Sequence, residues 1–160
     1  MTKKERVQSV IRGETPDRTP AGFWYHFPSD EHSGSAAVAA HLDYLRDTDV
    51  DMLKIMNENL YRVDSPPQGA ADWRKLQPAP LSAPFYQDQL EVVRNVLDAV
   101  DDSVYTLITI HGVFASAFHM LGLPEDRFEQ QNPVEQLLAE DPEPVADGFR
   151  AIGESLAGFA

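Results

Sequence analysis

Short apolar segments alternate with amphipathic ones along this chain, and that alternation constrains the fold more than any other feature. Residues 21–27, 51–57 and 103–110 are rich in aromatic, apolar or β-branched side chains, which is typical of strands buried on both faces. For residues 51–57, Met and Lys leave a helix as the alternative. Around these segments, apolar side chains recur every three or four residues, as on a helix with one buried face. The pattern predicts an α/β fold with parallel strands joined by crossover helices.

Capping signals place the helices. Thr2 and Glu5 have the spacing of a capping box, and Gly13 follows as a stop. We expect helices over residues 3–12, 36–47, 83–100 and 113–121, and two more that begin after Asn132 and Asp141.

The helix over residues 83–100 has the clearest periodicity, and residues 58–81 before it form a long, proline-rich loop. A loop of that length predicts a functional role, such as a lid. The stripe that we expect this helix to bury is Tyr86, Leu90, Val93, Leu97 and Val100.

Three such strands would form a sheet too small to cover its own apolar faces. An uncovered apolar face of roughly 400 Å² forfeits about 10 kcal/mol at ~25 cal/mol per Å². That is comparable to the net stability of a whole domain. We therefore expect a homo-oligomer or a complementing chain to complete the sheet, or a longer protein of which this chain is a piece.

Charge and cysteine content exclude several classes of protein. The net charge of −13 argues against nucleic acid and anionic membranes as partners. The absence of cysteine excludes disulfides, thiolate metal sites and a Cys nucleophile within these 160 residues. The start of the chain lacks the apolar core of a secretion signal, and no apolar run could span a bilayer, so we expect a cytoplasmic protein.

Chemistry in parallel α/β folds sits beyond the carboxyl ends of the strands. That rule selects His26, Glu58 and His111 as an acid–base set for a small-molecule substrate. A structural role for either histidine, or a merely solvated Glu58, is the alternative. The same rule places Asp51 at the wrong end of its strand, as a turn or capping residue. The strand ends also supply candidate substrate-binding residues, although the two aromatic ones could instead be core: Trp24, Tyr25, Asn57 and Gly112.

Three motifs follow one another at the start of the chain: Glu-Arg-Val at 5–7, Ile-Arg-Gly-Glu at 11–14 and Pro-Asp-Arg-Thr-Pro at 16–20. Their order resembles the opening of the uroporphyrinogen decarboxylase family. Residues 49–55 are similar to that family's second strand, and residues 110–116 to the glycine-containing turn after its third. No nucleotide-binding, zinc-protease or serine-hydrolase motif competes with this resemblance.

The resemblance implies a partial (β/α)8 TIM-type barrel, with residues 1–160 as the N-terminal half of one barrel domain and residues 1–13 as its N-terminal helix. It also implies a carboxy-lyase that acts on a carboxylated tetrapyrrole without a cofactor. A carboxylate after the second strand is central in that family, which points to Glu58, and Ser116 falls in the third turn as a further substrate-binding residue. The family's arginine-rich turn after strand one is absent here, so we expect a smaller or less anionic substrate.

Two alternatives stay open. Relatives of the same fold are zinc-dependent methyltransferases that serve corrinoid proteins, with zinc ligands in a second half of the barrel. The chain could also be a non-catalytic piece that folds only with a partner or as an oligomer. We assign no metal ligands and no cofactor to these residues.

Overall fold

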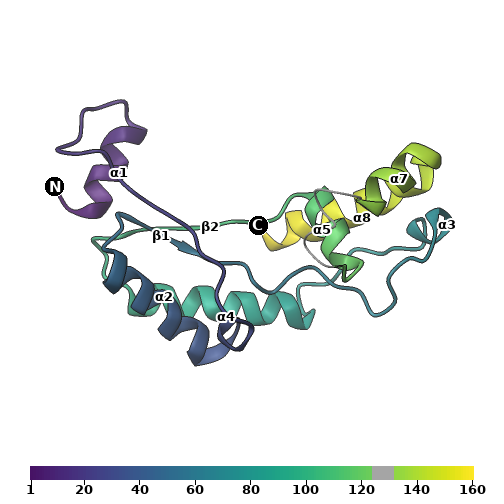
Figure 1. The fold of residues 1–160 in the computed structure, drawn as a ribbon, viewed down its shortest axis with the longest axis horizontal. Coiled ribbons are helices and arrows are strands. Elements are labelled where there is room, and N and C mark those ends of the chain that lie inside the picture. Colours follow the sequence, from purple (N-terminus) through teal and green to yellow (C-terminus); the bar gives the residue numbers. More distant parts are fainter. Residues whose placement is uncertain (124–131) are drawn as a thin grey trace. The chain divides into compact units, whose positions relative to one another are not determined.

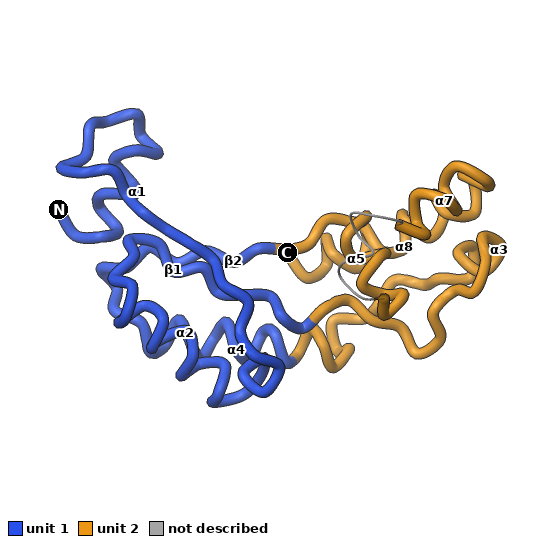
Figure 2. The backbone as a smooth tube through the Cα atoms, viewed as in Figure 1, with its two compact units in different colours: residues 1–59, 88–109 blue, residues 60–87, 110–160 orange. Residues whose placement is uncertain are grey.

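The computed structural model describes residues 1–123 and 132–160, which divide into two compact units (Figure 2). Unit 1 comprises residues 1–59 and 88–109, and unit 2 comprises residues 60–87 and 110–160. Figure 1 shows the order of the elements along the chain.

Unit 1 contains a small sheet and the helices around it. The capping box at its start is present, because Thr2 Oγ1 accepts from the backbone N–H of Glu5 and Glu5 Oε2 accepts from the N–H of Thr2. Its elements are α1 (Lys3–Ile11), a 3-10 turn η1 (Ser29–Glu31), α2 (Gly34–Thr48), β1 (Met52–Ile55), most of α4 (Pro84–Ala99) and β2 (Tyr105–Ile108).

The sheet of unit 1 has two parallel strands, with Met52 opposite Tyr105 and Ile55 opposite Ile108. The predictions of strands within residues 51–57 and 103–110 are therefore confirmed. Leu53 and Ile55 project from one face of β1, since side chains two residues apart share a face. Helices α2 and α4 cover that face (Figure 1). The buried apolar cluster between these elements is Ala37, Leu53, Ile55, Val92, Val96 and Val104.

Residues 21–27 correct the fold prediction, because they form no strand. The carbonyl of Ala21 accepts from the N–H groups of Asp51 and Met52 at 2.8 and 3.3 Å, but no ladder continues from there. The side chains that should have been buried are instead 64, 60 and 56% exposed: Phe23, Trp24 and Tyr25.

The physical reason lies in what a strand requires. An aromatic-rich extended segment becomes a strand only when a neighbour accepts its backbone hydrogen bonds, and Pro20 and Pro28 remove donors at both ends. The described residues thus contain one two-stranded sheet among helices. The prediction of a partial (β/α)8 TIM-type barrel is wrong.

Helix α4 also buries a different stripe from the one predicted. Its buried positions are Tyr86, Gln89, Val92 and Val96, whereas Leu97 is exposed. Leu90 and Val93 are only half-buried. Apolar periodicity indicates that one side of a helix is buried. Which of two adjacent lines of side chains on that side is covered depends on the elements that pack against it.

Unit 2 is a helical unit with its own core. Helix α8 carries the predicted stripe, with Val145 and Ile152 fully buried and Phe149, Leu156 and Phe159 packed against the same cluster. Asn132 caps α7 by accepting from the N–H of Val134, as its Asn-Pro sequence predicts. The described helices of unit 2 are α3 (Ala70–Trp73), α5 (Val113–Met120), α7 (Pro133–Glu140) and α8 (Pro142–Phe159). No described helix combines the length and apolar character that a membrane span needs.

Candidate functional site

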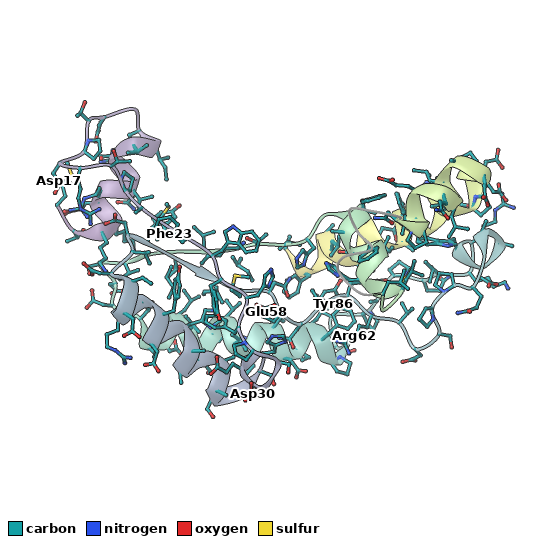
Figure 3. All side chains as sticks on the ribbon, viewed as in Figure 1. Asp17, Phe23, Asp30, Glu58, Arg62 and Tyr86 are labelled. Carbon is teal, nitrogen blue, oxygen red and sulfur yellow. The ribbon has the colours of Figure 1, made fainter. Side chains whose placement is uncertain are left out.

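Glu58 and His26, two of the predicted acid–base residues, are hydrogen-bonded in unit 1. Nδ1 of His26 lies 3.1 Å from Oε2 and 3.2 Å from Oε1 of Glu58. The Glu58 side chain is 8% exposed and the His26 side chain 52%. The N–H of Phe27 donates to Glu58 Oε1 at 3.3 Å. Glu58, labelled in Figure 3, is therefore a withdrawn carboxylate beside an accessible imidazole, and the alternative of a solvated loop residue is wrong.

Trp24 connects this pair to a cation that sequence reasoning missed. The ring centroids of Trp24 and His26 lie 5.1 Å apart in an edge-on arrangement. Lys54 Nζ lies 4.5 Å from the centroid of the same indole, which is cation–π distance. The sequence signal for Lys54 was its position within an otherwise apolar strand. Its side chain lies on the face opposite to that of Leu53 and Ile55, which is the covered one.

Tyr25 belongs to the same exposed aromatic segment. Its ring stacks on that of Tyr44 at 6.5 Å and meets Phe27 edge-on at 5.8 Å. Both predicted aromatic ligands of the substrate, Trp24 and Tyr25, are more than half exposed, so the core alternative is wrong for them.

Asn57 precedes Glu58 and carries an unpaired acceptor. Its Oδ1 is withdrawn from solvent and has no hydrogen-bond partner among the described residues. A buried amide oxygen without a donor costs free energy. It is therefore a candidate contact for a bound N–H or O–H group.

Buried side chains from α2 and α4 hold the end of β1 in place. His41 Nε2 accepts from the N–H of Met56 at 2.9 Å, and Gln89 Nε2 donates to the carbonyl of Met56 at 2.9 Å. Asn59 Nδ2 donates to Gln89 Oε1 at 3.0 Å. Neither His41 nor Gln89 was predicted to take part in the site. Gln89 lies outside the stripe predicted for its helix, so the sequence pattern carried no signal for it.

The remaining predicted site residues lie in unit 2. Gly112 is the N-cap of α5, and Ser116 is buried within that helix. The imidazoles of His111 and His119 lie 5.1 Å apart, centroid to centroid. These residues form a group of their own and keep their catalytic and binding roles as predictions.

Asp51 was predicted as a turn or capping residue and is instead the centre of a buried ion cluster. Its Oδ1 lies 2.6 Å from Arg6 Nη1, and its Oδ2 lies 2.6 Å from Arg18 Nη1. The N–H of Ala21 donates to Oδ2 at 2.9 Å. Burial alone would raise the pKa of Asp51, but the Ala21 N–H and the two guanidinium groups outweigh it and lower that pKa.

This cluster explains the opening motifs. Asp17 pairs with Arg6 through two hydrogen bonds at 2.6 and 2.9 Å. Arg6, Asp17 and Arg18, which belong to those motifs, thus fasten α1 and the following segment to the start of β1.

Within residues 1–123 and 132–160, no group of three or more His, Asp or Glu side chains is placed to hold a metal ion. No family model matches the chain, and no curated protein or solved structure does either. Among the described residues, the pair His26–Glu58 has the clearest geometry for chemistry.

Proposed function

We propose that the chain carries the acid–base centre of a carboxy-lyase that acts on a carboxylated small molecule. The observation that carries this proposal is the pair His26–Glu58, a carboxylate 8% exposed that is hydrogen-bonded to a half-exposed imidazole. A buried carboxylate that binds one ring nitrogen of an imidazole orients the ring so that the other nitrogen can transfer a proton. The resemblance of the opening motifs to the uroporphyrinogen decarboxylase family supports the same reaction class.

Decarboxylation needs one proton and no oxidant. The bond between the carboxylate carbon and its neighbour breaks, the electron pair stays on the neighbouring carbon, and carbon dioxide leaves. Protonated His26 then delivers a proton to that carbon through Nε2, because Nδ1 is engaged by Glu58. Glu58 offsets the positive charge of the imidazolium before the transfer, and solvent reprotonates His26 afterwards.

The surroundings of the pair support a planar or partly apolar anion as the substrate. Lys54 supplies a cation beside this pair, since its Nζ and the His26 ring both contact the Trp24 indole. One lysine can hold a carboxylate as a point charge, whereas a substrate with many carboxylates calls for several arginines. A substrate with one or two carboxylates on an aromatic body fits this set best.

The test is release of carbon dioxide by the whole chain from a panel of aromatic and pyrrolic acetates, with a porphyrinogen included. Glu58→Gln and His26→Gln should each lower kcat by about 100-fold, the usual contribution of a positioned proton donor. Glu91→Gln is the matched control, because Glu91 is an exposed glutamate on α4. Its turnover should equal that of the unmodified chain.

His111, the third residue of the predicted acid–base set, is tested in the same assay. His111→Gln lowers kcat if the third residue takes part, and leaves kcat unchanged if the pair in unit 1 acts alone. Unchanged turnover in both Glu58→Gln and His26→Gln would overturn the proposal, and so would the absence of carbon dioxide release from every acid in the panel.

Association with a second copy of the chain is a second candidate role. Three consecutive aromatic side chains, at residues 23–25, are more than half exposed, and exposed apolar clusters mark interaction surfaces. Sedimentation of the chain should show a dimer or larger species that Trp24→Glu weakens. A monomer at all concentrations would contradict this role.

A further inference from the structure

Both backbone polar groups of Met56 are bound by side chains rather than by a neighbouring strand. His41, from α2, accepts from the N–H of Met56, and Gln89, from α4, donates to its carbonyl, each at 2.9 Å. Both side chains are only 1% exposed. Met56 is the first residue after β1, so these two bonds end the strand and set the direction in which the chain leaves it.

The network continues from Gln89 back to the segment that carries His26. Asn59 Nδ2 donates both to Gln89 Oε1 and to the carbonyl of His32, at 3.0 and 3.1 Å. Nε2 of His32 lies 2.8 Å from the carbonyl of Phe27. Phe27 in turn donates its N–H to Glu58. The two sides of the His26–Glu58 pair are thereby joined through one chain of hydrogen bonds.

We infer that Gln89 and His41 are the positioning residues of this site, which hold the end of β1 so that the carboxylate of Glu58 meets Nδ1 of His26. Neither contacts the His26 imidazole. Gln89 acts through Met56 and Asn59, and His41 acts through Met56 and through its ring contact with Phe27, at 4.6 Å between centroids. The inference rests on the proposed function for its catalytic consequence. Its geometric part, the dependence of the Glu58 position on Gln89, stands on the hydrogen bonds alone.

The state of His41 fits this role. Nε2 can accept from Met56 only if it carries no proton, and Nδ1 lies 2.7 Å from the carbonyl of Ala37, so Nδ1 carries the proton. Burial lowers the pKa of His41, which keeps this neutral tautomer in place. The hydrogen bond that Nδ1 donates to the Ala37 carbonyl and the charge of Glu58 act to raise that pKa and are outweighed.

The experiment compares the whole chain with Gln89→Met, which keeps the length of the side chain and removes both of its hydrogen bonds. Amide hydrogen exchange of Phe27 should become at least about fivefold faster, since its partner Glu58 loses its fixed position. The Asp51 amide, which bonds the Ala21 carbonyl at the other end of β1, should exchange as before. In the carbon dioxide assay kcat should fall about tenfold with KM little changed.

Two further variants keep the test decisive. Gln87→Met is the control, because Gln87 is an exposed glutamine of the same helix. Asn59→Ala, at a half-buried position, removes the two bonds of the network that Asn59 donates to Gln89 and His32, and it replaces Gln89→Met if that variant does not fold. Unchanged exchange at Phe27 in the folded variant would overturn the inference. Faster exchange in a chain that decarboxylates nothing would overturn the proposed function and support the positioning role.

Discussion

Arg6 Nη1 lies 2.6 Å from Asp51 Oδ1, a pair that joins helix α1 to the residue just before β1. The Asp51 side chain is 1% exposed and that of Arg6 is 9%. Arg18 binds the second oxygen of the same carboxylate, also at 2.6 Å. Three segments of unit 1 thus meet at one buried charge.

Replacing that charge should be costly. Asp51→Asn leaves Arg6 without its buried partner, and loss of one member of a buried ion pair costs on the order of 3 kcal/mol. The free energy of unfolding in urea should fall by about this amount. Asp43→Asn is the control, because Asp43 pairs with Arg46 on the exposed face of α2 and should cost under about 0.5 kcal/mol. Equal losses in the two variants would contradict this assignment.

Acid should weaken unit 1 through the same cluster. The hydrogen bonds from Arg6 hold the pKa of Asp17 below its ordinary 3.8, and the pKa of Asp51 is lowered as well. A carboxyl group whose pKa is lower in the folded state than in the unfolded state stabilises the folded state. This contribution is complete above the unfolded pKa and is lost as pH falls through the folded pKa. Urea midpoints should therefore fall below about pH 4. Asp51→Asn should flatten that slope, and an identical slope would show that other carboxyls dominate.

Two glycines of helix α8 should respond oppositely to alanine. A Cβ at Gly148 would lie 2.7 Å from Trp73 Cε3 and 3.1 Å from the Trp73 carbonyl, so Gly148→Ala should destabilise the chain by about 1–3 kcal/mol. A Cβ at Gly153 would meet only Val113, at an ordinary 3.6 Å. Gly153→Ala should therefore stabilise the helix by about 0.5–1 kcal/mol. Thermal unfolding of the two variants checks both signs, and a shared sign would mean that the Trp73 packing is different.

Alkaline pH should reveal one tyrosine that ionises late. Burial, with the neighbouring Tyr61, raises the pKa of Tyr86 to about 12. Because its pKa is raised in the folded state, the stabilising effect is complete below about pH 10 and disappears as pH rises through the folded value. Absorbance of tyrosinate in the folded chain should show one tyrosine that titrates last, and Tyr86→Phe should remove that step. A late step that survives in Tyr86→Phe belongs to another tyrosine.

Local signals predicted most of the helices and two of the three expected strands, but not α3 (Ala70–Trp73), which lies within the residues predicted to be a loop. The capping box at Thr2 and the Asn132-Pro133 helix start involve only residues within one helical turn. They therefore form independently of the rest of the fold. The apolar stripe of α8 was also predicted, because one cluster covers the whole face. The stripe of α4 was predicted one row away from the one that is buried, since periodicity cannot say which neighbours will arrive.

The pair His26–Glu58 shows both sides of this division. The sequence by itself determined that an imidazole and a carboxylate follow two apolar segments. It could not determine that residues 21–27 stay outside the sheet, because a strand depends on partners for its N–H and C=O groups that lie far along the chain. Only the tertiary structure brought His26 within 3.1 Å of Glu58, and it did so through Met56, His41 and Gln89, whose hydrogen bonds join segments distant in sequence.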